Sequence, residues 1–116
     1  MSDPADEERR ESPRFPADVR CWVGDGRGVE RFARLADVSE RGVRVLTTAP
    51  PAVGSRVSLR FKLPPVGDEV EADALVMWRR EEVESRAGAM GLQFDRVLGR
   101  ETIQAYSEEL QRGESR

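Results

Sequence analysis

The stretch SRVSLRFKL (55–63) decides the fold class, because from Arg56 its side chains alternate strictly between polar and apolar. From Val57 onward every odd position is apolar and every even position is polar. A period of two is typical of a β-strand with one buried face and one solvated face. Pro64, Pro65 and Gly67 follow and end the strand.

Five further segments on either side of this stretch have strand character, and turns separate them. They are 17–23, 29–38, 42–48, 69–82 and 87–94. The alternation in the fourth of them predicts one shared face for Val70, Ala72, Ala74, Val76 and Trp78. Six short strands at this spacing predict a mostly β protein, either an antiparallel barrel or a sandwich.

The apolar period changes near the C-terminus. Ile103, Tyr106 and Leu110 recur at helical spacing within 99–112, and they predict one amphipathic helix that packs on the strands. We expect no other helix.

The chain divides into one domain and two polar ends. Residues 1–12 contain almost nothing to bury and predict a flexible tail, and residues 113–116 predict a frayed C-terminus. Residues 13–112 are then a single domain of ordinary size.

Composition excludes several functional classes. The 116 residues include no histidine and one cysteine, so neither a histidine-based catalytic triad nor a His/Cys zinc site is available. One cysteine forms no intrachain disulfide, and no apolar run approaches the ~20 residues of a membrane helix. We therefore expect a cytoplasmic protein that is not an enzyme, with no catalytic residue, metal, cofactor or membrane insertion.

Arginine dominates the basic residues. Nineteen residues are Lys or Arg, and Lys62 is the only lysine. Guanidinium offers a rigid donor fork for phosphates and guanine edges. The formal net charge of −3 nevertheless argues against general DNA or RNA binding. A single-stranded nucleic-acid site on Arg56, Arg60 and Lys62 would lack interleaved aromatic residues, because Phe61 belongs to the opposite face.

Two short motifs stand out from this background. The sequence DVSERG (37–42) is a D-x-S-x-x-G at a junction between two strands, where Asp, Ser and Gly are also ordinary turn residues and glycine supplies positive φ. Arg10 and Arg14 form an R-x-x-x-R directly before the first strand. That spacing recurs four times elsewhere, so only its position distinguishes this copy.

The order of these motifs on the six-strand-plus-helix layout resembles the PilZ domain, a bacterial receptor module for cyclic di-GMP. The resemblance runs from about Arg9 to Leu110 and includes VGSRVSLRFKLP (53–64) and MGLQF (90–94). It implies a six-stranded antiparallel PilZ-type β-barrel with one C-terminal α-helix. It also implies cyclic di-GMP as the ligand.

The resemblance further implies roles for individual residues. Arg10 and Arg14 would bind guanine or phosphate, because a guanidinium can bind O6 and N7 of guanine or pair with phosphate. Asp37 would accept hydrogen bonds from the guanine N1–H and amine. Ser39 would donate to the ligand, and Gly42 would hold the turn close to it.

Two more residues are candidates for the same site. Arg9 would add a third guanidinium fork. Trp78 would stack on a guanine, although its place in the alternation predicts core packing instead.

The same resemblance suggests a mechanism. The N-terminal arginine segment would become ordered around the ligand and present a new surface to a separate, unidentified protein partner. The alternative is a PilZ-fold interaction adaptor that does not bind the dinucleotide. Pro13 between the arginines bears on that alternative, because it stiffens the spacer.

Overall fold

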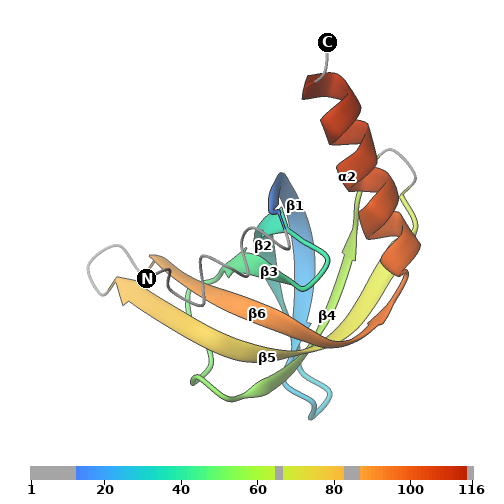
Figure 1. Ribbon diagram of the computed structural model, residues 1–116. Coiled ribbons are helices and arrows are strands. Elements are labelled where there is room, and N and C mark those ends of the chain that lie inside the picture. Colours follow the sequence, from blue (N-terminus) through green and yellow to red (C-terminus); the bar gives the residue numbers. More distant parts are fainter. Residues whose placement is uncertain (1–12, 65–66, 83–86, 115–116) are drawn as a thin grey trace, which may run out of the picture.

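The barrel predicted from the sequence is confirmed. The computed structural model describes residues 13–64, 67–82 and 87–114. The elements are β1 (Phe15–Gly24), β2 (Glu30–Val38), β3 (Gly42–Leu46), β4 (Arg56–Lys62), β5 (Glu69–Glu82), β6 (Ala87–Leu98) and α2 (Arg100–Glu114). The strands are antiparallel and close into a barrel in the order β1-β2-β3-β6-β5-β4 (Figure 1). The predicted tail 1–12 lies outside the described residues.

The inward faces of the strands form one apolar core. In β4 the predicted alternation holds, because Val57, Leu59 and Phe61 are all at most 4% exposed. The core residues of β1 and β5, the two neighbours of β4, pack against them. This single cluster is what fixes the barrel, since every strand contributes to it.

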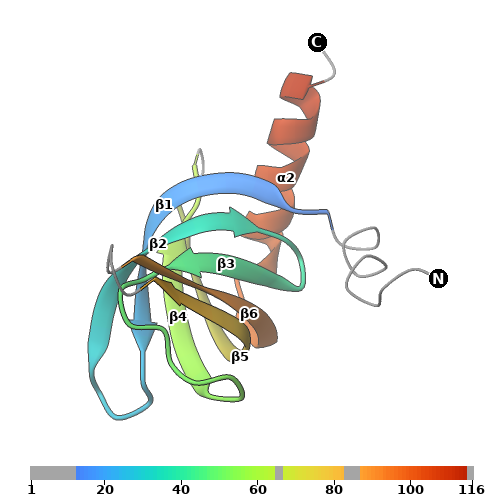
Figure 2. The same ribbon diagram turned by 90° about the vertical axis from the view of Figure 1, so that its left-hand side faces the viewer.

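Helix α2 closes one end of the barrel. Its residues Ile103 and Tyr106 belong to the core cluster, and the Tyr106 hydroxyl donates to the Pro16 carbonyl at 2.5 Å. Pro16 lies at the start of β1, so the helix stands at that end, opposite the turn that joins β1 to β2 (Figure 2). The helix continues to Glu114, beyond the predicted end at 112. No helix in the described part of the chain is long and apolar enough to cross a membrane.

The predicted face of Trp78 is wrong. Val70, Ala72, Ala74 and Val76 are buried as expected, but Trp78 is 38% exposed and outside the core cluster. The reason is an irregularity in the β5–β6 pairing between Val76 and Trp78, where β5 has one extra residue. Such a β-bulge moves the residues after it to the other face of the sheet.

Strand β6 is longer than predicted. It pairs with β5 through Leu98, beyond the expected end at 94. The alternation fades there because a second irregularity, between Asp73 and Ala74 of β5, shifts the register. The pattern of side chains therefore ends before the backbone pairing does.

Candidate functional site

Asp37 points away from the core because of a bulge in β2. Leu35 pairs with Val45, and both are fully buried. Two residues later in a regular strand, Asp37 would share that inward face. The register shifts between Leu35 and Asp37, so Asp37 instead pairs with Arg44 of β3, and its side chain is 15% exposed. The bulge thus presents one carboxylate on the outer surface of the barrel.

Two arginines hold this carboxylate. Arg44 Nε donates to Oδ2 at 2.8 Å, and Arg14 Nη1 donates to Oδ1 at 3.1 Å. Arg14 is close because Pro16, two residues later, pairs with Asp37 at the start of β1. Both arginine side chains remain about two-fifths exposed, at 40% and 42%. Two partly exposed guanidinium groups therefore donate to one carboxylate at the surface of the barrel.

Ser39 lies inside the turn that follows Asp37. Its hydroxyl donates to the Gly42 carbonyl at 3.2 Å and accepts from the backbone N–H groups of Arg41 and Gly42. The residue is 4% exposed. The hydroxyl therefore holds the four-residue turn closed, as serine does in many turns.

Gly42 is needed for a different reason than expected. It is not among the described residues with positive φ. A Cβ atom at this position would collide with the backbone carbonyl oxygen of Leu92 on β6. Glycine therefore allows β3 and β6 to approach each other at the end of the turn.

The turn is also anchored from outside. The Phe94 N–H of β6 donates to the Arg41 carbonyl at 2.7 Å, and Arg100 at the start of α2 donates to the Glu40 carbonyl at 3.2 Å. These bonds connect the turn to two other elements. Asp37 is consequently positioned by a rigid support rather than by a loop that moves alone.

Trp78 lies in the same cross-strand row as Asp37. Asp37 pairs with Arg44, Arg44 pairs with Gly91 of β6, and Gly91 pairs with Trp78 of β5. A side chain on Gly91 would occupy the place of the indole, so the ring lies over this glycine. Three strand spacings separate the two ends of the row, or roughly 14 Å. The Asp37 carboxylate, the Arg44 guanidinium and the partly exposed Trp78 indole thus follow one another on the outer wall of the barrel.

The structure brings four of the predicted residues, Arg14, Asp37, Ser39 and Gly42, to one region, and Trp78 ends the same row. Arg9 and Arg10 lie outside the described residues. Arg44 was missed in the sequence. It could have been found, because Asp37 and Arg44 are placed symmetrically about the turn 39–42 and a hairpin with that turn opposes them.

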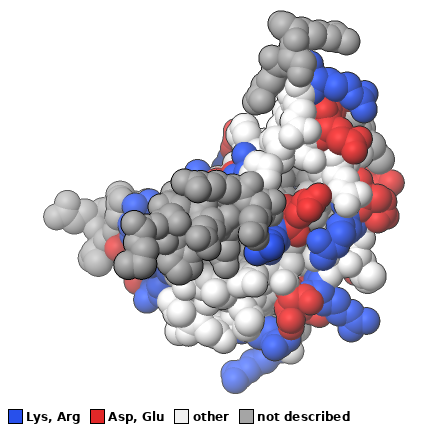
Figure 3. Space-filling view, in the orientation of Figure 1, with Lys and Arg blue, Asp and Glu red and all other residues white. Residues whose placement is uncertain are grey.

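Figure 3 shows how charge is distributed on one face of the molecule. On the described part of the face in Figure 3, basic and acidic side chains lie interspersed. Among the described residues no group of three or more His, Cys, Asp or Glu side chains could hold a metal ion. The cluster around Asp37 is a local arrangement of two guanidinium donors and one carboxylate acceptor.

Solved structures share this fold. One similar structure is the inhibitor of motility MotI/DgrA of Bacillus subtilis, with a TM-score of 0.74 and 17% sequence identity over 93% of this chain and 53% of that chain. Another is the c-di-GMP complex of MrkH from K. pneumonia, with a TM-score of 0.70 and 21% identity over 93% of this chain and 54% of that chain. The PilZ domain of YcgR from Escherichia coli with c-di-GMP is also similar, with a TM-score of 0.64 and 19% identity over 93% of this chain and 98% of that chain. This chain spans about half the length of the first two proteins.

Sequence comparison identifies the family. No curated protein matches the chain. The family model of the PilZ domain, in contrast, matches residues 8–109, which is most of the sequence and includes the site around Asp37. The chain therefore belongs to the PilZ domain family, whose members are non-enzymatic receptors for cyclic di-GMP.

Proposed function

We propose that this protein binds cyclic di-GMP on the outer face of the barrel, at the row that runs from Asp37 to Trp78. The observation that carries the proposal is the bulge in β2, which turns Asp37 outward and places it between Arg14 and Arg44. The ligand offers two phosphates and two guanines. Two forks, one carboxylate and an exposed indole match those groups in kind.

Each side chain has a distinct task in this proposal. Asp37 accepts from the N1–H and the amine of a guanine, for which a carboxylate is suited because it has two acceptor oxygens. Arg14 and Arg10 bind phosphate or the Hoogsteen edge of a base, and Arg9 adds a third fork. Trp78 stacks on a guanine at the far end of the row. Gly42 and Ser39 hold the turn, and direct donation from Ser39 would require it to give up its bond to the Gly42 carbonyl.

Ligand binding competes with a contact already present. Both oxygens of Asp37 accept from arginines, so a guanine edge must displace Arg14, Arg44 or both from the carboxylate. Arg14 precedes β1 and is more easily moved than Arg44, which lies within a strand. We propose that Arg14 exchanges its bond to Asp37 for a bond to the ligand. The segment before it then rearranges with Arg10.

This exchange provides a signal to a partner. The N-terminal arginine segment closes over the ligand and forms a new surface with the barrel wall, which a separate protein recognises. The proposal includes the cytoplasmic location expected from the sequence. Amide hydrogen exchange tests this step: we expect residues 9–14 to become protected at saturating cyclic di-GMP. Unchanged exchange in that segment would contradict the rearrangement but not the binding.

Isothermal titration calorimetry with cyclic di-GMP tests the binding itself. We expect saturable binding, and we expect Arg14→Ala and Arg10→Ala each to weaken it at least tenfold, since a charge-assisted hydrogen bond contributes about 1.5–3 kcal/mol. Arg27→Ala is the matched control, because Arg27 lies in the turn at the opposite end of β1. Absence of heat from a folded sample would favour the adaptor that does not bind the dinucleotide.

A further inference from the structure

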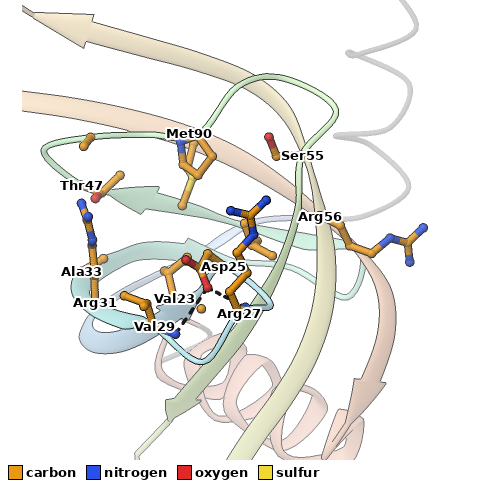
Figure 4. A pocket seen from close by; sticks show the side chains of 14 residues that line it. Val23, Asp25, Arg27, Val29, Arg31, Ala33, Thr47, Ser55, Arg56 and Met90 are labelled. Atoms are coloured by element: carbon orange, nitrogen blue, oxygen red, sulfur yellow. Dashed lines mark hydrogen bonds between the residues drawn. The ribbon is translucent and has the colours of Figure 1, made fainter.

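The open end of the barrel contains a cavity that the proposed cyclic di-GMP site does not use. It lies opposite α2, beside the β1–β2 turn, and has a volume of about 370 Å³ (Figure 4). That volume is within the usual range for small-molecule sites, about 300–1,000 Å³. Its apolar floor is made by core residues that include Val57 and Met90, which are 4% and 1% exposed.

Arg31 occupies an inward position at this end. It pairs with Val23 of β1, and its neighbour Phe32 points outward and is 59% exposed. The next residue, Ala33, packs against the core. Arg31 itself is exposed at the mouth of the barrel, so its guanidinium stays solvated and is available to a ligand in the cavity that it lines.

Arg31 and Arg27 both lack an ion-pair partner in the described chain, and both line the cavity. In Figure 4 the two side chains extend from the β1–β2 region toward the cavity, whereas Arg56 points away. Arg56 is paired with Asp95. Asp25, the one acidic residue of the lining, accepts from the backbone N–H of Arg27 at 2.7 Å and so serves the turn.

We propose that this cavity binds a small amphipathic carboxylate. The carboxylate head pairs with Arg27 and Arg31, for which a bidentate fork is the matching geometry. The apolar part of the ligand lies above the floor of Val57 and Met90 and displaces water from the more exposed apolar side chains of the lining, above all Val29, which is 52% exposed. A nucleotide fits less well, because no aromatic residue lines the cavity to stack on a base.

Octanoate is a suitable probe, and ¹H–¹⁵N correlation spectra of the full chain provide the readout. We expect octanoate to shift the amides of residues 23, 31, 33, 57 and 90 in a saturable manner. Acetate, which has no apolar body, and octylamine, which has the opposite charge, should shift them weakly or not at all. Absence of shifts with octanoate, or equal affinity for acetate, would overturn the proposal.

Two substitutions test the assigned head group. Arg31→Gln and Arg27→Gln should each weaken octanoate binding about tenfold or more. Arg27 lies in the turn, so its replacement leaves strand pairing intact even if Arg31→Gln affects folding. Arg20→Gln on the outer face of β1 is the control and should bind octanoate as the unmodified chain does. Octanoate affinity unchanged by Arg27→Gln would also overturn the proposal.

Discussion

The ion pairs of Asp37 with Arg14 and Arg44 are more important for recognition than for stability. Partly exposed pairs of this kind contribute about 0–1 kcal/mol each, because water already solvates both partners. Two such pairs on one carboxylate do not explain the bulge that exposes it. A ligand that needs a fixed acceptor explains it better, since backbone irregularities are common where a side chain must be redirected.

Asp37→Asn separates these two roles. We expect the free energy of unfolding in urea to change by no more than about 1 kcal/mol. Cyclic di-GMP affinity should fall at least tenfold, because an amide has one acceptor oxygen and cannot serve both the N1–H and the amine of guanine. Asp95→Asn is the matched control, because Asp95 also pairs with an arginine, Arg56, away from the row. A large loss of stability with unchanged affinity would contradict this assignment.

Cys21 is predicted to be unreactive in the folded protein. Burial raises the pKa of its thiol to about 12, because the thiolate would lose its hydration. Ellman's reagent at pH about 8 should therefore find no reactive thiol in the native chain and one after denaturation. The unfolded thiol ionises near its ordinary pKa of 9.0, so this group favours unfolding increasingly from there up to about pH 12. Cys21→Ala should remove that part of the alkaline decline.

The positions of some site residues could be predicted from the sequence, and the positions of others could not. Arg14 and Asp37 were grouped through the family resemblance, and the structure places them in contact, while their role in ligand binding stays a prediction. The face of Trp78 could not be predicted from alternation, because a single extra residue in β5 reverses it without a clear signal in the side chains. The same applies to Asp37, whose outward direction depends on the bulge after Leu35.

At the scale of elements, close approach of β3 and β6 supports the site. Gly42 and Gly91 both belong to these two strands, and both leave room that a Cβ would fill. The obstacle at Gly42 is backbone, which cannot move without opening the sheet. The obstacle at Gly91 is the Trp78 ring, which can rotate away. Gly42 therefore maintains the pairing of β3 with β6, whereas Gly91 maintains the position of the Trp78 ring.

Gly42→Ala should destabilise the fold by about 3 kcal/mol or more, because overpacking against backbone is not relieved by a rotamer change. Gly91→Ala should cost less stability and instead displace Trp78, which changes the tryptophan fluorescence. Gly113→Ala is the control: nothing lies near its Cβ in α2, and alanine favours a helix over glycine. Urea unfolding of the three variants measures these effects, and equal costs at residues 42 and 113 would contradict the packing argument.

The six strands and the helix were all predicted in the correct order, because each carries its own periodicity and glycine or proline marks most of the boundaries between them. The ends of the elements were less accurate. Strand β6 continues to Leu98 through pairing with β5, and α2 continues to Glu114. Backbone pairing and helix propagation do not require an apolar residue at each step, so the pattern of side chains stops earlier than the element.

At the scale of the molecule, the barrel separates three regions. Helix α2 closes one end, the candidate cyclic di-GMP row runs across the outer wall from β2 to β5, and the cavity lies at the other end (Figures 1 and 2). The core between them is continuous and contributes the rigidity on which both surfaces depend. Variants at the row and variants at the cavity should therefore have independent effects on their two ligands.

The response of cyclic di-GMP binding to salt distinguishes local contacts from the field of the whole molecule. The chain has a formal net charge of −3, and the ligand is a dianion. If the overall field controlled association, added salt would screen the repulsion and strengthen binding. If Arg14 and Arg44 control it through contacts at hydrogen-bond distance, added salt should weaken binding.

We expect the second result, with affinity falling roughly three- to tenfold between about 0.05 and about 0.5 M NaCl in calorimetric titrations. Lys62→Gln makes the net charge more negative by one unit at the exposed end of β4, and it should leave both the affinity and its salt dependence unchanged. Arg14→Ala should instead flatten the salt dependence, since it removes one of the local pairs. Affinity that rises with salt would show that the net charge of the chain, rather than the local contacts of Arg14 and Arg44, controls the affinity for cyclic di-GMP.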